Sequence, residues 1–147
     1  MKNLLYLKDD QIKDFIQLLY HAYRETMSDP KHILAKKSFG PAHLRAINLI
    51  ERYPGTSQSE LMFKLKITKQ SLNRVLRDLI DSNVIKQIKD DADTRKKKLF
   101  LDKDGVIFFE RIFDSQKKRI FEALKNSEPE SVIKFKEVLS KIINEKK

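Results

Sequence analysis

The sequence predicts a mainly α-helical α+β protein, with about six helices and one two-stranded β-hairpin, in a single domain spanning residues 1–147. Only three glycines and four prolines interrupt the chain, which favours long helices. Apolar residues recur at helical spacing through most of it. Two short runs of strand-forming residues, at 84–90 and 96–101, flank a polar loop. A hydrophobic content of 40% is enough to fill one core.

The first helix is expected to begin at an N-cap formed by Asp9 or Asp10. Its apolar positions repeat at helical spacing and are Ile12, Phe15, Ile16, Leu19, Ala22 and Tyr23. The segment 28–41 breaks this pattern. Pro41 follows Gly40 and suits the first position of a second helix, which is expected to run to about Tyr53.

A short third helix is expected after Ser57, because Ser57 and Glu60 have the spacing of a capping box in front of apolar residues. Thr68 can cap a fourth helix. The apolar residues of that helix face inward and are Leu72, Val75, Leu76 and Leu79. A short capped helix, a brief turn and a second helix are the order of a helix-turn-helix motif.

The fourth helix leaves a polar outer face made of Gln70, Asn73, Arg74 and Arg77. These side chains can donate hydrogen bonds to phosphates, and Gln, Asn and Arg can also form paired hydrogen bonds with base edges in a major groove. The alternative is an ordinary solvated helix face.

The segment after the fourth helix predicts a wing. Asn83 can adopt the left-handed conformation that ends a helix. The two strands then follow, with the loop "DADTR" between them. Residues 64–98 hold eleven lysines or arginines and five acids, so +6 of the net charge of +10 lies in this part of the chain. A concentration of positive charge on one unit is typical of proteins that bind DNA.

The stretch "ITKQSLNRVLRDLIDSNVIKQIKDDADTRKKKLFLDKDG" resembles the winged-helix core of the multiple-antibiotic-resistance regulator (MarR) family. The resemblance includes the recognition helix, an Asp-x-Arg wing formed by Asp93 and Arg95, and Gly105 at the start of the next helix. Asp102 and Asn83 stand where the family usually has threonine and glycine, and both substitutes suit a helix end. The resemblance implies a winged-helix transcriptional regulator in which Arg95 enters a minor groove and Asp93 braces it.

The end of the chain carries two further amphipathic helices. The apolar row of the first is Val106, Phe109, Ile112, Phe113, Ile120 and Leu124, and that of the second is Val132, Phe135, Leu139 and Ile142. These rows could close on the first helix within one chain. The family resemblance instead implies that residues 1–36 and 102–147 form a helical dimerisation region around a winged core at 41–101. A two-fold dimer would read a pseudo-palindromic operator.

The sequence therefore predicts a homodimeric repressor that reads double-stranded DNA, with the fourth helix in the major groove and the wing in the minor groove. The predicted contact residues are Thr68, Lys69, Gln70, Ser71, Asn73, Arg74, Arg77, Arg95, Lys96 and Lys97, with Asp93 bracing the wing. For Lys96, Lys97 and Lys98, a solubilising strand edge is an equal alternative. A winged-helix module that contacts an acidic protein is the rival function.

Other classes of function find less support. Catalytic motifs and glycine-rich phosphate loops are absent, so no enzyme and no cofactor are expected. The absence of cysteine excludes disulfides and thiolate metal sites, and the histidines His21, His32 and His43 are expected to be structural or surface residues rather than metal ligands. The N-terminal sequence has neither a signal peptide nor a membrane span, which indicates a cytoplasmic protein with no membrane partner.

The family resemblance also implies a small-molecule effector pocket between the dimer helices and the reading unit, which Tyr23, His43 or Phe109 could line.

Overall fold

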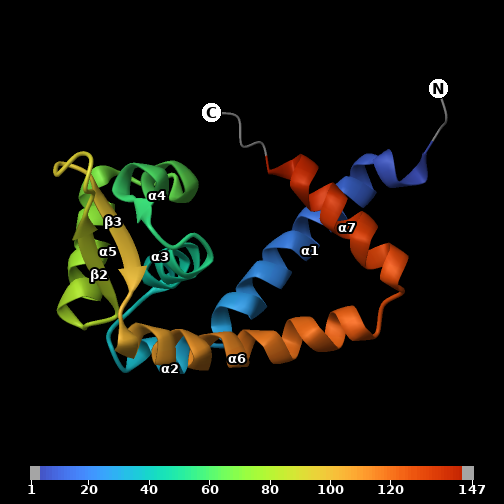
Figure 1. Ribbon diagram of the computed structural model, residues 1–147. Coiled ribbons are helices and arrows are strands. Elements are labelled where there is room, and N and C mark those ends of the chain that lie inside the picture. Colours follow the sequence, from blue (N-terminus) through green and yellow to red (C-terminus); the bar gives the residue numbers. More distant parts are fainter. Residues whose placement is uncertain (1–3, 144–147) are drawn as a thin grey trace.

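The computed structural model describes residues 4–143 (Figure 1). A 3-10 helix at Leu5–Leu7 is followed by α1 (Asp9–Ser28), α2 (Lys31–Ala35), α3 (Pro41–Arg52), β1 (Thr56–Ser57), α4 (Gln58–Leu65), α5 (Lys69–Asp81), β2 (Ile85–Lys89), β3 (Lys97–Leu101), α6 (Lys103–Lys125) and α7 (Pro129–Ile142). This is the predicted winged-helix fold, and the described residues contain one more α-helix, a short 3-10 helix and one more strand than expected.

The extra elements are short and lie in segments whose sequence patterns are weak. Helix α2 has five residues and lies in the stretch 28–41, where no helix was expected. Strand β1 has two residues and pairs with β3, so the sheet has three antiparallel strands in the order β1-β3-β2. Thr56 lies opposite Leu99, and Ile85 lies opposite Leu101. Lys98 pairs with Ser57 on one side and Ile88 on the other, so it does not lie at the strand edge considered above, whereas Lys97 lies beyond the two residues of β1.

The helix ends largely follow the sequence signals. The side chains of Ser57 and Thr68 accept hydrogen bonds from the N–H groups of Glu60 and Ser71, as expected of N-caps. Two expectations were wrong in detail. The N-cap of α1 is Lys8, and Asp9 and Asp10 lie in the first turn. Their negative charges there interact favourably with the positive end of the helix dipole. Glu60 accepts from the Thr56 hydroxyl at 2.8 Å, so it does not complete the capping box with Ser57.

One hydrophobic core joins α3, α4, α5, the sheet and the first half of α6. Leu72, Val75, Leu76 and Leu79 of α5 are all buried in it, as predicted. Phe108 and Ile112 bring α6 onto the same core. Asn83 has a φ of 60°, the left-handed conformation expected at the end of α5.

Gly105 makes the closest approach of α6 to the sheet. A Cβ atom on this residue would lie 1.8 Å from the carbonyl oxygen of Val84. That carbonyl accepts a hydrogen bond from the N–H of Asp102 at 2.9 Å, which fixes the start of α6 against the start of β2. Only glycine fits here, so the glycine couples the long helix to the wing.

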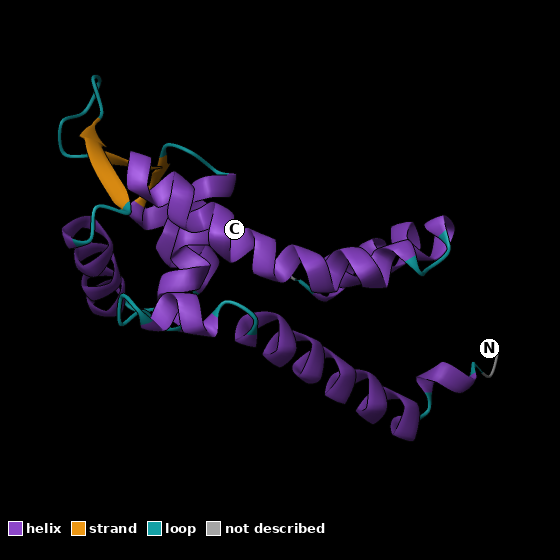
Figure 2. Ribbon diagram, turned by 90° about the horizontal axis from the view of Figure 1, so that it is seen from below, coloured by secondary structure: helices purple, strands orange, loops and turns teal. Residues whose placement is uncertain are grey.

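Two helical arms extend from the core: one is α1, and the other is the second half of α6 together with α7 (Figure 1). Helices α1 and α7 cross in Figure 1 but are well separated in Figure 2, so they do not cover each other. Neither helix has a buried residue. The large apolar side chains exposed on them and on α6 include Ile12, Phe15, Ile16, Tyr23, Phe113, Ile120, Leu124, Phe135, Val138 and Ile142.

A polar contact near the core ties α1 to α6. The Arg119 guanidinium donates to both carboxylate oxygens of Asp29, at 2.7 and 2.9 Å. The hydrogen bond from Arg119, together with its positive charge, holds the pKa of the Asp29 carboxyl below its usual value. Gln116 also donates to the carbonyl of Thr26 at 2.9 Å. The two arms are therefore held at a defined angle where they leave the core.

Candidate DNA-binding surface

The helix-turn-helix is built by α4 and α5. Helix α4 ends at Lys66, whose φ of 53° turns the chain in the left-handed region. Two residues later the Thr68 hydroxyl caps α5: its oxygen accepts from the Ser71 N–H at 3.1 Å and its hydrogen is donated to the Ser71 hydroxyl at 3.0 Å. The hydroxyls of Thr68 and Ser71 therefore fix the start of α5, and both residues are exposed.

The polar face of α5 is exposed along its length. Lys69, Gln70, Ser71, Asn73, Arg74 and Arg77 are all exposed, while the apolar face of the same helix is buried. One partner of this face was missed from the sequence. Gln58, at the start of α4, donates a hydrogen bond to the side-chain oxygen of Asn73. The NH2 group of Asn73 then remains free to donate. The contact was missed because its two residues are 15 positions apart on separate helices, which gives no periodic signal in the sequence.

The wing is the hairpin of β2 and β3 with its loop at 90–96. The loop is closed by backbone hydrogen bonds from Asp90 N to Lys96 O and from Lys96 N to Asp93 O, both 2.9 Å. The Asp90 carboxylate accepts from the Ala92 N–H, which lowers the pKa of this carboxyl. The acids of this charged segment thus shape the loop.

Asp93 and Arg95 lie at the tip of the wing. One carboxylate oxygen of Asp93 accepts from the N–H of Arg95 at 3.0 Å and from its guanidinium Nε at 3.4 Å. The Arg95 side chain is nevertheless 90% exposed, so its remaining donors face solvent. An aspartate that holds the stem of an arginine while leaving its outer end free has the geometry that wing bracing requires.

The lysines beside the loop add positive charge to the hairpin. Lys97 of β3 lies directly opposite Lys89 of β2, and both are exposed. Like charges placed opposite each other across two strands are unfavourable unless a counter-charge is near. The arrangement suits a surface that meets an anion.

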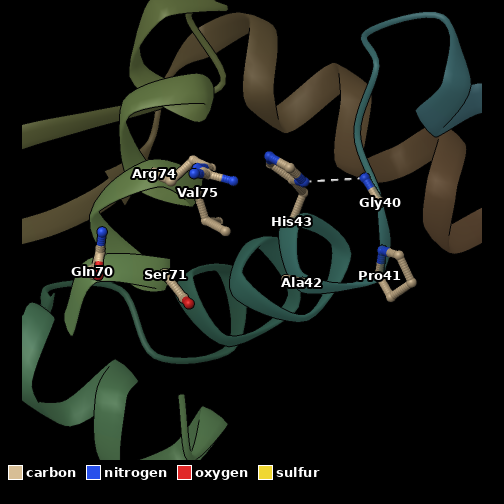
Figure 3. Close-up of a pocket in the computed structure, with 8 residues that line it drawn as sticks. All are labelled: Gly40, Pro41, Ala42, His43, Gln70, Ser71, Arg74 and Val75. Atoms are coloured by element: carbon tan, nitrogen blue, oxygen red, sulfur yellow. Dashed lines mark hydrogen bonds between the residues drawn. The ribbon is translucent and has the colours of Figure 1, made fainter. Parts of the chain in front are cut away.

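The three histidines lie in different surroundings. His21 and His32 are exposed on α1 and α2. His43 is half-buried and lines a hollow between the start of α3 and α5, together with Gly40, Pro41, Ala42, Gln70, Ser71, Arg74 and Val75 (Figure 3). Tyr23 and Phe109 do not line this hollow, so the structure does not gather the three suggested effector contacts there. Within residues 4–143, no group of three His, Asp or Glu side chains is placed to hold a metal ion.

A second hollow lies where α6 leaves the core beside α1 and α3. Its walls are mainly apolar, and Lys117 supplies one cation beside them. The lining residues are Thr26, Asn48, Phe113, Gln116, Lys117, Ile120, Phe121 and Leu124. None of the helices described between residues 4 and 143 combines the length and the apolar character that a membrane span requires.

A helix-turn-helix with an exposed polar second helix, followed by a hairpin that presents an arginine, defines the class of winged-helix transcriptional regulators. Comparison with known proteins supports this assignment. A model of the MarR family matches residues 38–96. The HTH-type transcriptional regulator PetP of Rhodobacter capsulatus is 36% identical over 143 residues, covering 97% of this chain and 86% of the relative. The chain belongs to the MarR family of transcriptional regulators.

Solved structures agree on the fold. FabT of Streptococcus pneumoniae, in complex with DNA, has a TM-score of 0.73 at 16% identity and covers 89% of this chain and 94% of its own. A mutant of MarR from E. coli, in complex with operator DNA, has a TM-score of 0.67 at 17% identity over 96% and 99% of the two chains. NadR, in complex with 4-hydroxyphenylacetate, has a TM-score of 0.77 at 19% identity over 99% and 100%.

Proposed function

We propose that the chain acts in the cytoplasm as a homodimeric repressor that reads a pseudo-palindromic operator in double-stranded DNA. Residues 41–101 form the reading unit, and residues 1–36 and 102–147 form the dimerisation region. The contact surface consists of Thr68, Lys69, Gln70, Ser71, Asn73, Arg74, Arg77, Arg95, Lys96 and Lys97. No catalytic activity is part of the proposal. The observation that carries it is that an exposed polar face on α5 occurs together with a highly exposed arginine at the wing tip.

Helix α5 has the chemistry needed in a major groove. A major groove admits an α-helix and presents a distinct donor and acceptor pattern for each base pair. The N-terminal half of α5 presents Gln70, Asn73 and Arg74 on one exposed face. With its oxygen occupied by Gln58, Asn73 offers its NH2 donors to base acceptors. Thr68, Lys69 and Ser71 lie at the positive end of the helix dipole, where phosphates are favoured.

The wing has the chemistry needed in a minor groove. A guanidinium is attracted by the negative potential of a narrow minor groove, and Arg95 is the exposed cation at the end of the hairpin. Asp93 limits the conformations of the side chain before binding, which lowers the entropy that binding costs. Lys96 and Lys97 follow Arg95 directly and would meet the adjoining phosphates.

The apolar side chains exposed on α1 and α7 support a homodimer. Helices with this much exposed apolar surface are typical of an interface rather than of a monomer in water. Homodimers usually have two-fold symmetry, which presents two identical reading units to DNA. Two linked contacts bind far more tightly than one, because the second contact is intramolecular.

The proposal includes a small-molecule effector. The hollow beside Lys117 combines apolar walls with one cation, which suits an aromatic acid. The structure of the similar protein NadR contains 4-hydroxyphenylacetate, a molecule of that chemistry. A ligand at this place would contact α6 near its junction with α1 and could change the angle between the arms and the reading units.

Replacing Arg95 with alanine tests the wing. Loss of one phosphate or groove contact per protomer should weaken operator binding about tenfold and reduce the slope of log affinity against log salt by about one for each protomer. The affinity can be measured by fluorescence anisotropy over a series of salt concentrations. The matched control is Arg111→Ala, which removes an exposed arginine of α6. If R95A keeps both the affinity and the salt slope of the unmodified protein, the wing assignment is wrong.

A further inference from the structure

Helix α5 must be held in one position to present its polar face to DNA. Its N-terminal end is fixed by the Thr68 cap. Further along, α5 packs against α3. His43 of α3 projects toward α5 at this junction (Figure 3).

His43 makes two hydrogen bonds that together define its tautomer. The N–H of Gly40 donates to Nδ1 of His43 at 3.0 Å. Because Nδ1 accepts, the ring hydrogen of the neutral imidazole lies on Nε2, which donates to a carboxylate oxygen of Asp78 at 2.9 Å. One ring thus joins the first residue before α3 to the recognition helix.

The ring is also fixed in orientation by packing. Phe39 stacks on it, with 4.7 Å between ring centroids and 13° between ring planes. The His43 side chain is only 14% exposed, so water competes weakly for its hydrogen bonds. Phe39 in turn makes an edge contact with Phe108 of α6, which connects the same unit to the core.

The bond to Asp78 also affects Arg74. Arg74 and Asp78 are four residues apart on α5, a spacing at which opposite charges commonly pair on a helix surface. Among the described residues, no ion pair joins them, and one oxygen of the Asp78 carboxylate accepts from His43 instead. Arg74 lines the same hollow opposite His43 and remains available to a ligand outside the helix (Figure 3).

We infer that His43 is a positioning residue for DNA recognition: as the Nε2–H tautomer it holds α5 against the start of α3 and keeps Asp78 from neutralising Arg74. This inference rests on the proposed function, since it assigns a role in the reading of DNA by α5. The role is mechanical and electrostatic, because His43 acts through Asp78 and does not itself meet the bases.

Replacing His43 with leucine should weaken binding to the selected operator about tenfold, the equivalent of one lost hydrogen bond to a charged group. Binding to random duplex of the same length should change by less than about threefold, because phosphate contacts from other cations remain. His43→Gln should restore operator affinity to within about threefold, because the glutamine amide also offers an acceptor and a donor on one rigid group. The exposed histidine His32 provides the matched control, His32→Leu, which should bind as the unmodified protein does.

Two further measurements separate positioning from general stability. In a double-mutant cycle with Asp78→Ala, the effect of His43→Leu on operator affinity should shrink several-fold, because the partner is already absent. The ¹⁵N resonances of His43 should show hydrogen on Nε2 and none on Nδ1. The inference is overturned if H43L binds the operator normally with only a lower melting temperature, if the cycle shows no coupling, or if Nδ1 carries the hydrogen. If no operator is selected at all, the proposed function is wrong. The tautomer of His43 then still tests whether its ring donates to Asp78.

Discussion

Replacing Gly105 with alanine should destabilise the protein by at least about 3 kcal/mol, whereas alanine in an exposed helix normally stabilises relative to glycine. The added Cβ would lie 1.8 Å from the Val84 carbonyl oxygen and 2.8 Å from its carbon, so α6 or the start of β2 must move. Movement also breaks the hydrogen bond from Asp102 N to Val84 O. For a chain of this length, the melting temperature should fall by roughly 10 °C, measured by circular dichroism.

Gly40→Ala is the control for the Gly105 substitution. A Cβ on Gly40 would have no atom within 4 Å, so this variant should melt within a few degrees of the unmodified protein. If G105A and G40A melt alike, the close packing of α6 on the wing is not a feature of the folded protein. The comparison tests the link between the arms and the reading unit without any need for DNA.

Replacing Phe135 with glutamate should convert the dimer to monomers and weaken operator binding by roughly a hundredfold or more, because two linked half-site contacts become independent. Phe135 is 49% exposed in the single chain and lies on α7, a helix with no buried residue. A carboxylate in an apolar interface would be buried without a counter-charge, which is strongly unfavourable. Mass measurement in solution and anisotropy on operator DNA would show the two effects together.

Lys134→Ala is the matched control, because it also lowers the net charge by one and lies next to Phe135 on α7. The Lys134 side chain is 65% exposed and pairs only with Glu137 on the same helix, among the residues that the structure describes. This variant should remain dimeric and lose little operator affinity. A dimeric F135E would show that α7 does not contribute to the interface as proposed. A monomeric K134A would show that the change in charge, rather than the loss of Phe135, separates the two chains.

Local sequence patterns predicted most of the fold because the deciding interactions lie within a few residues. The apolar spacing of α5 placed Leu72, Val75 and Leu79 correctly in the core. Polar residues at helix starts identified the caps of α4 and α5, and Asn83 marked the end of α5. In each case the chemistry of one turn determines the conformation.

The features that were missed depend on contacts between distant residues. Strand β1 exists because Thr56 and Ser57 pair with Leu99 and Lys98, and two residues alone carry no alternating pattern. The contact of Gln58 with Asn73 and that of His43 with Asp78 both join separate helices. His43 was expected to be a surface or structural histidine, and both of its ring nitrogens are indeed hydrogen-bonded. Its particular partners on Gly40 and α5 are what no local spacing reveals.

The wing contains both features that the sequence predicted and features that only the structure shows. Its charged run mixes acids with basic residues, and the assignment of Asp93 and Arg95 came from the family resemblance rather than from charge alone. The structure adds that Asp90 and Asp93 close the loop through backbone N–H groups, which explains acids on an otherwise basic surface. The entry of Arg95 into a DNA groove stays a prediction for experiment.

The central claim is that the chain reads a two-fold symmetric DNA site as a homodimer, and selection from a random double-stranded DNA library tests it most directly. The mass of the complex should be measured at the same time. We predict enrichment of an inverted repeat whose half-sites lie about one helical turn apart, bound by two chains. Binding no tighter to any selected sequence than to random duplex, or a single half-site bound by one chain, would contradict the account.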